Sequence, residues 1–202
     1  MSTQVNVDDR RRQLLDAAAR LIAERGYHAV RIADIAELVG TSTGTVHYHF
    51  PGKDDVLRAA LTHAMDRAFA RQSAPLKELD DPRARLLLLI DMQLPRPGEL
   101  RAEWSVWVQF WAEAMINPDL REIHDQYYSR WRRAVAKNVE QGIERGGIAA
   151  EVDADEFAHQ LTALTDGLAI RVLTDSSGCD VERMRELVVA FVDRALPVPE
   201  TS

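Results

Sequence analysis

Small polar side chains are concentrated between residues 41 and 48. Their hydroxyl, imidazole and phenol groups can donate and accept hydrogen bonds, and Gly44 lets the backbone approach a partner closely. Lys53 follows at the predicted start of a helix, where a positive charge and free backbone N–H groups suit a phosphate. Phosphate contacts position a protein on DNA, and base contacts give sequence selectivity. The segment therefore predicts a DNA contact formed by Thr41, Ser42, Thr43, Thr45, His47, Tyr48 and Lys53.

Aromatic side chains form a second group in the middle of the chain. Trp104, Trp107 and Trp111 are three and four residues apart, so a helix places them on one face. Aromatic clusters line apolar ligand pockets, and their ring faces attract cations. The group predicts a small-molecule site, for an amine or a flat hydrophobic compound, although core aromatics can have the same spacing. The predicted ligand-binding residues are Trp104, Trp107, Phe110, Trp111, Tyr127 and Asp166. The carboxylates that could balance a bound cation are Glu103, Glu113 and Asp166.

Residues suited to catalysis or metal binding are few. His47 and His49 are two residues apart, so on a helix they point to different faces and do not suit one metal ion. The single cysteine, Cys179, excludes an intrachain disulfide and a cysteine-rich zinc site. The only loose acid–base candidates are His124, His159 and Asp166. We therefore predict no catalytic site, no metal and no cofactor, and a protein that is not an enzyme.

The composition is that of a soluble globular protein. The 202 residues, of which 28% are charged and 46% hydrophobic, suit one or two domains. No run approaches 18 apolar residues, so no transmembrane helix is predicted, and the single cysteine fits a reducing cytoplasm. The formal net charge of −7 disfavours a general nucleic-acid binder. Residues 1–60 are neutral overall, however, so the negative charge lies downstream of the predicted DNA contact.

Two short helices position the polar segment. One is predicted from about Ile32 to Val39, and Gly40 ends it. Ser42 is a suitable N-cap for a second helix through about His47, on which Val46 faces the core. Two short helices joined by a tight turn with glycine have the geometry of a helix-turn-helix. Because such pairs also occur without DNA binding, spacing alone leaves the function open.

The rest of the chain is also predicted to be helical. Apolar spacing over residues 14–22 predicts a helix that follows a loose polar arm at residues 1–12. Further helices are predicted to begin after Asn or Asp N-caps, which are Asp81, Asn117, Asp153 and Asp180. No strand pattern and no internal repeat is evident. The expected fold is all-α, with a helix-turn-helix domain of three helices at residues 1–55 and a helical ligand-binding and dimerisation domain at residues 56–202.

The segment Gly26–Leu57 resembles the DNA-binding signature of the tetracycline-repressor (TetR) family of transcriptional regulators. In that family the pattern Ser42-x-Gly44 opens the helix that contacts bases, and His49-Phe50 closes it. Lys53 matches a lysine that contacts the DNA backbone. The resemblance covers about the first quarter of the chain. It implies a DNA-binding regulator, most often a repressor that a small-molecule inducer releases from a palindromic operator.

Several positions depart from this signature. Family members commonly carry a Thr-Thr pair where this chain has Val30-Arg31, so the usual N-cap of the helix at 32–39 is lost. Arg31 could contact a phosphate instead and is included among the predicted DNA contacts. A frequent tyrosine is replaced by His47, which is expected to alter operator preference.

The last two predicted helices carry broad apolar stripes. In TetR-like proteins the C-terminal domain dimerises, and two such helices from each subunit would suit a four-helix interface. The same stripes could instead face the core of one subunit; the resemblance favours the dimer. The predicted interface residues are Phe157, Leu161, Leu164, Leu168, Met184, Val188 and Phe191. Thr165–Leu168 and Gly52–Asp54 also resemble the choline-responsive, BetI-like branch of the family.

The expected function is therefore a cytoplasmic, ligand-responsive repressor that binds double-stranded operator DNA as a homodimer. Two other classes remain open. A helical carrier protein would keep the aromatic site without selective DNA binding. A helical enzyme would need the loose acid–base candidates named above to converge in one pocket.

Overall fold

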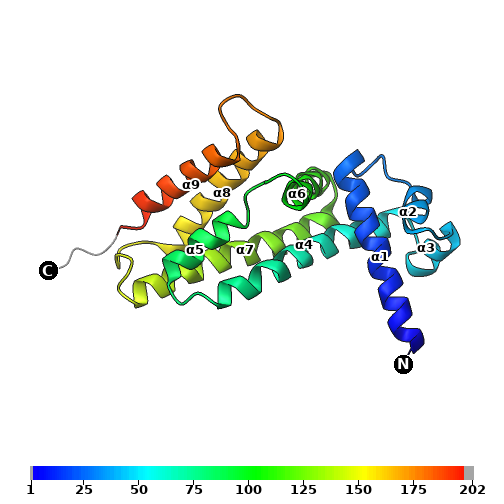
Figure 1. The fold of residues 1–202 in the computed structure, drawn as a ribbon, viewed down its shortest axis with the longest axis horizontal. Helices are drawn as coiled ribbons and strands as arrows, with labels where there is room; N and C mark the ends of the chain where they lie inside the picture. Colours follow the sequence, from blue (N-terminus) through cyan, green and yellow to red (C-terminus); the bar gives the residue numbers. More distant parts are fainter. Residues whose placement is uncertain (1, 198–202) are drawn as a thin grey trace. The chain divides into compact units, whose positions relative to one another are not determined.

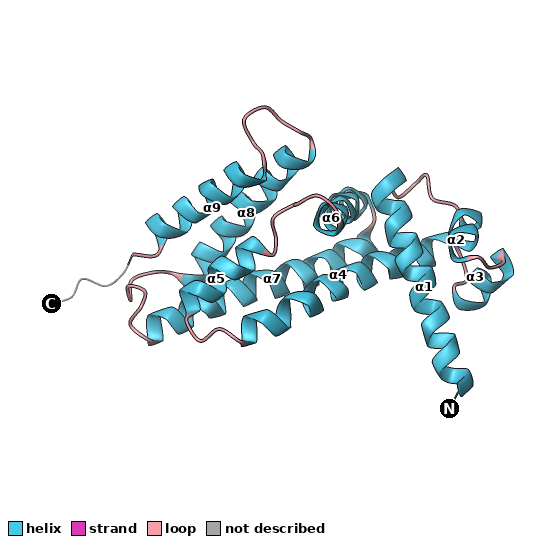
Figure 2. Ribbon diagram, in the orientation of Figure 1, coloured by secondary structure: helices cyan, strands magenta, loops and turns pink. Residues whose placement is uncertain are grey.

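The computed structural model describes residues 2–197, and every regular element in that part of the chain is a helix (Figures 1 and 2), which confirms the all-α prediction. The elements are α1 (Ser2–Arg25), α2 (Ile32–Val39), α3 (Thr43–His49), α4 (Lys53–Lys77), α5 (Pro82–Asp91), α6 (Glu99–Ile116), α7 (Pro118–Glu144), α8 (Ala154–Leu173) and α9 (Val181–Ala195). None of these helices is both long enough and apolar enough to cross a membrane.

The chain divides into two compact units. Unit 1 comprises residues 1–69 and 102–124, and unit 2 comprises residues 70–101 and 125–202. Unit 1 thus contains α1 to α3 and most of α4 and α6, whereas α5, α8 and α9 belong to unit 2. The predicted boundary between residues 55 and 56 falls inside α4, which continues to Lys77.

Unit 1 is organised around the apolar face of α1. Leu14, Ala18 and Ile22 are fully buried, and α1 packs against α2, which in turn packs against α3. Val46 anchors α3 from the inside, since none of its surface is exposed. The expected loose arm at residues 1–12 is wrong, because α1 begins at Ser2. Spacing of apolar residues did not predict helix over residues 2–12, because Val5 and Val7 are the only apolar residues there.

The predicted N-caps explain where the later helices begin. The side chains of Asp81, Asp153 and Asp180 each accept hydrogen bonds from backbone N–H groups in the first turns of α5, α8 and α9. The Asn117 side chain accepts one from the Asp119 N–H at 3.0 Å, at the start of α7. These bonds satisfy donors that the helix itself leaves unpaired, which is why these residue types mark helix starts.

Unit 2 is built on the pairing of α8 with α9, against which α5 also packs. Two ion pairs join α9 to α5: Arg185 contacts Asp91 with an N–O distance of 2.6 Å, and Arg83 contacts Asp193. The Phe157 ring stacks on Phe191 with ring centroids 5.5 Å apart. Apolar packing therefore fills the space between the two helices.

Most of the predicted interface residues are buried within the single chain. Phe157, Leu161, Leu168, Met184 and Val188 are at most 6% exposed, so they have almost no surface left for a second subunit. Their stripes face the core of unit 2, which was the alternative that spacing left open. Leu164 and Phe191 are half-buried, and their place in an interface stays a prediction.

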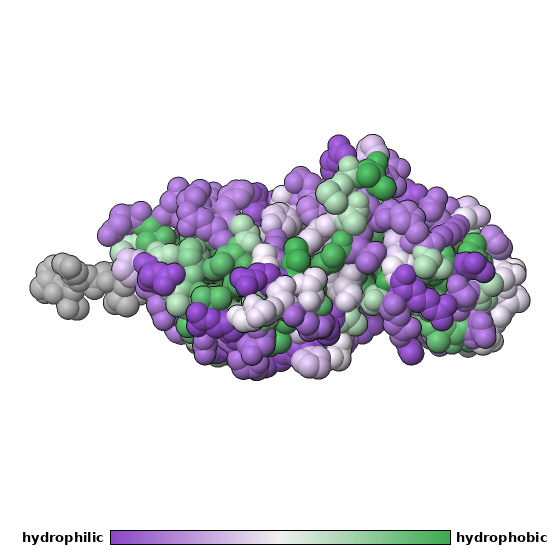
Figure 3. Space-filling view, turned by 90° about the horizontal axis from the view of Figure 1, so that it is seen from above, coloured by the Kyte–Doolittle hydropathy of each residue, from purple (hydrophilic) through white to green (hydrophobic). Residues whose placement is uncertain are grey.

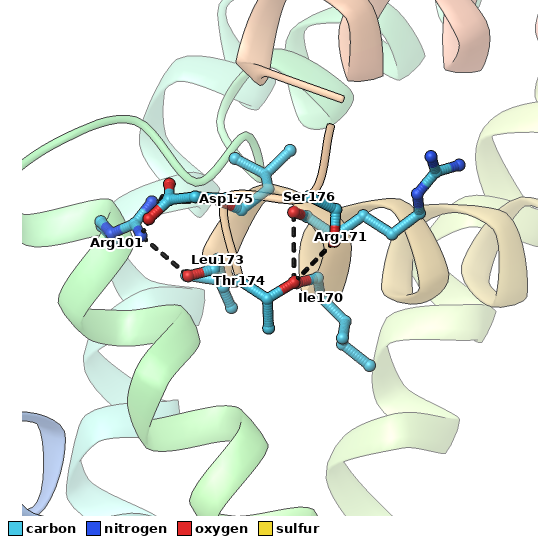
Figure 4. Close-up of polar contacts among 8 residues, drawn as sticks. Arg101, Ile170, Arg171, Leu173, Thr174, Asp175 and Ser176 are labelled. Atoms are coloured by element: carbon cyan, nitrogen blue, oxygen red, sulfur yellow. Dashed lines mark hydrogen bonds and ion pairs between the residues drawn. The ribbon is translucent and has the colours of Figure 1, made fainter. Parts of the chain in front are cut away.

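The C-terminal end of α8 is held by an arginine from the start of α6 (Figure 4). Arg101 donates hydrogen bonds to the carbonyl oxygens of Val172 and Leu173 at 3.3 and 2.8 Å. Its guanidinium group also lies 3.4 Å from the carboxylate of Asp175, the one described residue other than glycine with positive φ. Positive charge at a helix C-terminus is favourable, so Arg101 acts as an external cap for α8.

Candidate nucleic-acid interface and ligand site

The turn of the helix-turn-helix begins at Gly40, which ends α2. Gly40 has φ +68°, a left-handed conformation that other residues rarely adopt, and the following Thr41 N–H donates to the Ala36 carbonyl at 2.9 Å. Ser42 then caps α3, since its Oγ accepts from the Thr45 N–H at 3.1 Å. These contacts confirm the predicted cap and turn. They fix the direction in which α3 leaves α2.

The structure places most of the predicted DNA contacts of α3 at the surface. Ser42, Thr43 and His47 are exposed, and 76% of Tyr48 is accessible. Thr41 and Thr45 are half-buried, and the Thr45 hydroxyl lies 3.1 Å from the Ser42 hydroxyl. The helix therefore presents one hydrogen-bonding face to solvent while Val46 holds the opposite face in the core.

Arg31 is exposed and gives no side-chain cap to α2, as the departure from the Thr-Thr pattern predicted. A guanidinium group has no acceptor, so it cannot receive a bond from the helix N–H groups. Asp34 compensates in part, because its carboxylate accepts a hydrogen bond from the Arg31 backbone N–H at 3.0 Å. The Arg31 side chain is thus left available for a phosphate. This role of Asp34 was not predicted from the sequence, although the residue stands three positions beyond the cap, where a capping-box acid is expected.

Lys53 lies at the first position of α4 and is tied to the loop before α2. Its ammonium group donates to the His28 carbonyl oxygen at 2.9 Å. His28 in turn places its ring Nε2 2.7 Å from the Glu113 carboxylate of α6, and Glu113 is 7% exposed. Glu113 was expected to balance a bound cation, and its partner in the structure is instead His28.

The neighbouring residue of this loop also contacts α6. The Tyr27 backbone N–H donates to Gln109 Oε1 at 3.4 Å, and the Tyr27 ring is buried. Burial, together with the nearby carboxylates of Asp54 and Glu113, raises the pKa of the Tyr27 phenol to about 12. The phenol therefore stays neutral at physiological pH. Spacing in the sequence gave no signal for these contacts, because they join residues far apart in the chain.

The predicted aromatic residues of α6 do form one cluster within unit 1. Trp111 lies 6.2 Å from Trp104 and 6.3 Å from Trp107 between ring centroids, and Phe110 lies 6.2 Å from Trp107. Trp104 and Phe110 are buried, whereas Trp107 and Trp111 are half-buried. The Trp111 Nε1 atom is buried without a hydrogen-bond partner among the described residues. The cluster offers ring faces for a cation and one unused N–H donor.

Tyr127 and Asp166, the other two predicted ligand residues, belong to unit 2. Tyr127 is half-buried on α7. Asp166 accepts a hydrogen bond from the Tyr128 hydroxyl at 2.6 Å, a partner that sequence analysis did not identify. Burial raises the pKa of Asp166 to about 6, and the Tyr128 hydrogen bond partly opposes that rise. Burial and the same bond raise the pKa of Tyr128. Asp166 is therefore a carboxylate whose charge is costly unless a cation compensates it.

Two family models match the chain. The model described as "Bacterial regulatory proteins, tetR family" matches residues 14–60, and the model described as "BetI-type transcriptional repressor, C-terminal" matches residues 82–197. Among curated proteins, the transcriptional regulator BetI 1 of Chromohalobacter salexigens is 30% identical over 190 residues, which cover 93% of this chain and 90% of that protein. The regulator PksA of Bacillus subtilis is 27% identical over 195 residues, 96% of this chain and 93% of its own.

Solved structures of transcriptional regulators are also similar to this chain. A transcriptional regulator from Saccharomonospora viridis, crystallised in complex with choline, is 46% identical with a TM-score of 0.89, over 94% of this chain and 98% of its own. A TetR-family regulator from Rhodococcus sp. is 29% identical with a TM-score of 0.82, over 94% of this chain and 100% of its own.

Proposed function

Because the chain belongs to the tetR family of bacterial transcriptional regulators, with a BetI-type C-terminal domain, we propose that it represses transcription by binding a palindromic operator as a homodimer. The observation that carries the proposal is the exposed hydrogen-bonding face of α3, which Lys53 follows at the start of α4. Two such helices would enter successive major grooves, about 34–36 Å apart. The operator lies in the cytoplasm, which we propose as the location of the protein.

We further propose that a quaternary amine of the choline type is the inducer. The aromatic cluster of α6 supports this, since tryptophan faces attract a cation without hydrogen-bonding to it. A relative with 46% identity binds choline. The inducer would release the operator only if it binds the released conformation more tightly than the DNA-bound one.

The operator proposal is tested by measuring binding of the purified protein to DNA that flanks its own gene, by fluorescence anisotropy over a range of salt concentrations. We expect selective binding that competitor DNA of unrelated sequence does not abolish. Added choline should lower the affinity. Equal binding to flanking and unrelated DNA would contradict the function as a regulator.

The ligand proposal is tested by tryptophan fluorescence with a matched pair of compounds. Choline and 3,3-dimethylbutan-1-ol have the same shape, but only choline is charged. If the ring faces bind the cation, choline should quench the fluorescence at concentrations at least tenfold lower, because a desolvated cation–π contact contributes about 2 kcal/mol or more. Equal affinity for the two compounds would favour a hydrophobic inducer, and binding of neither would remove the choline proposal.

A further inference from the structure

We infer that Glu113 and Gln109 are positioning residues that couple the aromatic site on α6 to Lys53, through the loop at residues 26–28. The inference rests on the proposed function, in which α6 contacts the inducer and Lys53 contacts the DNA backbone. All the contacts that support it lie within unit 1.

The shortest contact is between Glu113 and His28. The carboxylate of Glu113 is nearly buried, with 9% of its side chain exposed, whereas 76% of the His28 side chain is exposed. A buried acid needs a partner, because an unpaired charge away from water is costly. The distance of 2.7 Å makes His28 that partner. The exposed loop is therefore held at a fixed point on α6.

A second contact fixes the orientation of the same loop. The Tyr27 N–H donates to Gln109 at 3.4 Å, one helical turn before Glu113. The turn at Gly26, with φ +84°, brings the backbone so close that an added Cβ would lie 3.5 Å from the Gln109 side chain. The loop thus contacts two successive turns of α6.

The loop carries these contacts on to Lys53. The His28 carbonyl oxygen accepts the hydrogen bond from the Lys53 ammonium group at 2.9 Å. The side chain of His28 binds α6 and its backbone binds Lys53, so a shift of α6 reaches the ammonium group through a single residue. Glu113 and Gln109 therefore influence where the positive charge lies when a phosphate approaches.

Helical geometry places these two residues opposite the tryptophan side chains. Gln109 and Glu113 are each two residues beyond Trp107 and Trp111, which corresponds to about 200° around the helix axis. A ligand that contacts the tryptophans thus acts on one side of α6, and the loop is bound to the other side. Any displacement of α6 across its axis changes the length of the bonds to His28 and Tyr27.

The test compares operator affinity, without and with choline, for His28→Ala, Glu113→Met and the control Glu122→Gln. Glu113→Met keeps length and helix propensity while removing the acceptor, and Glu122 is an exposed acid on α7 within the same unit. We expect His28→Ala and Glu113→Met to weaken operator binding about fivefold or more without choline. Glu122→Gln should bind as the wild type does. The fraction of affinity lost on adding choline should also shrink in both test variants.

A double variant separates positioning from a general structural effect. If Glu113 acts through Lys53, combining Glu113→Met with Lys53→Ala should weaken binding no more than Lys53→Ala alone. Additive losses, or wild-type operator affinity in both His28→Ala and Glu113→Met, would overturn the inference. If Glu113→Met failed to fold, the surface variant His28→Ala would decide. A wild type that ignores choline would contradict the proposed inducer, while the operator affinities would still decide the role of Glu113.

Discussion

Lys53 combines two features that suit a phosphate, a positive charge and a position in the first turn of α4. We predict that Lys53→Ala weakens binding to every DNA sequence alike. It should also reduce the slope of log affinity against log salt by about one, since one counterion fewer is released. Salt titrations of anisotropy on the operator and on unrelated DNA measure both effects. Lys77→Ala, at the far end of α4, is the control, and an unchanged slope in Lys53→Ala would show that Lys53 contacts no phosphate.

Asp166 predicts a dependence of stability on pH. Its pKa is about 6 in the folded protein against 3.8 in the unfolded chain, so between these values the folded state binds more protons. The free energy of unfolding should therefore fall as pH rises from about 4 to about 6, by up to roughly 3 kcal/mol relative to Asp166→Asn. Urea denaturation of both proteins across this pH range measures the difference.

The Tyr128 hydroxyl provides a control for this prediction. Its hydrogen bond lowers the pKa of Asp166, so Tyr128→Phe should move the loss of stability to higher pH. Parallel pH profiles for wild type and Asp166→Asn would mean that Asp166 is not shifted.

At the scale of single residues, the sequence correctly predicted contacts between residues that are close together in the chain. The Ser42 cap, the inward Val46 and the contact between the Trp107 and Trp111 rings all follow from spacings of three or four residues. The pairing of His28 with Glu113 does not, because it depends on how distant segments pack. Glu113 is one of three glutamates on α6, and the sequence suggested only that it could balance a bound cation.

The features of the helices that the sequence predicts best in this chain are the residues at which they begin. Each of the four predicted Asn and Asp caps is confirmed by a hydrogen bond to the first turn that follows it. Helix α1 shows the limit, since its first turns carry no apolar stripe and no cap that would mark Ser2 as a start. A capping hydrogen bond depends on residues no more than four positions apart. The length of a polar helix depends instead on the helix propensities of many residues added together.

The cap of α8 can be tested alone. Asp153→Ala removes the acceptor that binds the Glu156 N–H at 3.0 Å. We predict a loss of about 1 kcal/mol in the free energy of unfolding, measured by urea denaturation. Asp155→Ala, which removes an exposed acid from the first turn without removing the cap, should cost less. Equal losses would indicate that only the charge near the helix end matters.

For the whole molecule, apolar stripes predicted burial correctly but could not distinguish a core from an interface. Five of the seven proposed interface residues proved to be buried within unit 2. Periodicity shows which face of a helix avoids water and contains no information on whether the covering surface comes from the same chain. Figure 3 shows apolar side chains that remain exposed among hydrophilic ones on one face of the molecule.

We propose that a dimer uses the outward face of α8, with half-buried Leu164 beside it. Ala163, Gly167 and Ile170 are exposed at spacings of four and three, and a Cβ at Gly167 would meet nothing within 4 Å. Small residues on this face would allow the helices of two subunits to approach closely.

The proposed dimer predicts that Ile170→Asp dissociates the protein into monomers, as measured by sedimentation velocity at micromolar concentration. A charge in an apolar interface costs several kcal/mol when it has no partner. Ile116→Asp, which changes an equally apolar and more exposed residue at the end of α6, should leave the association state unchanged. Dimers in both variants would place the interface elsewhere.

The capped helix starts have a consequence for how such proteins diverge. Because Asp81, Asp153 and Asp180 each define a helix start within one turn, the position of that start does not depend on the rest of the helix. Surface residues between the caps can therefore change during evolution without shifting the register of the buried faces.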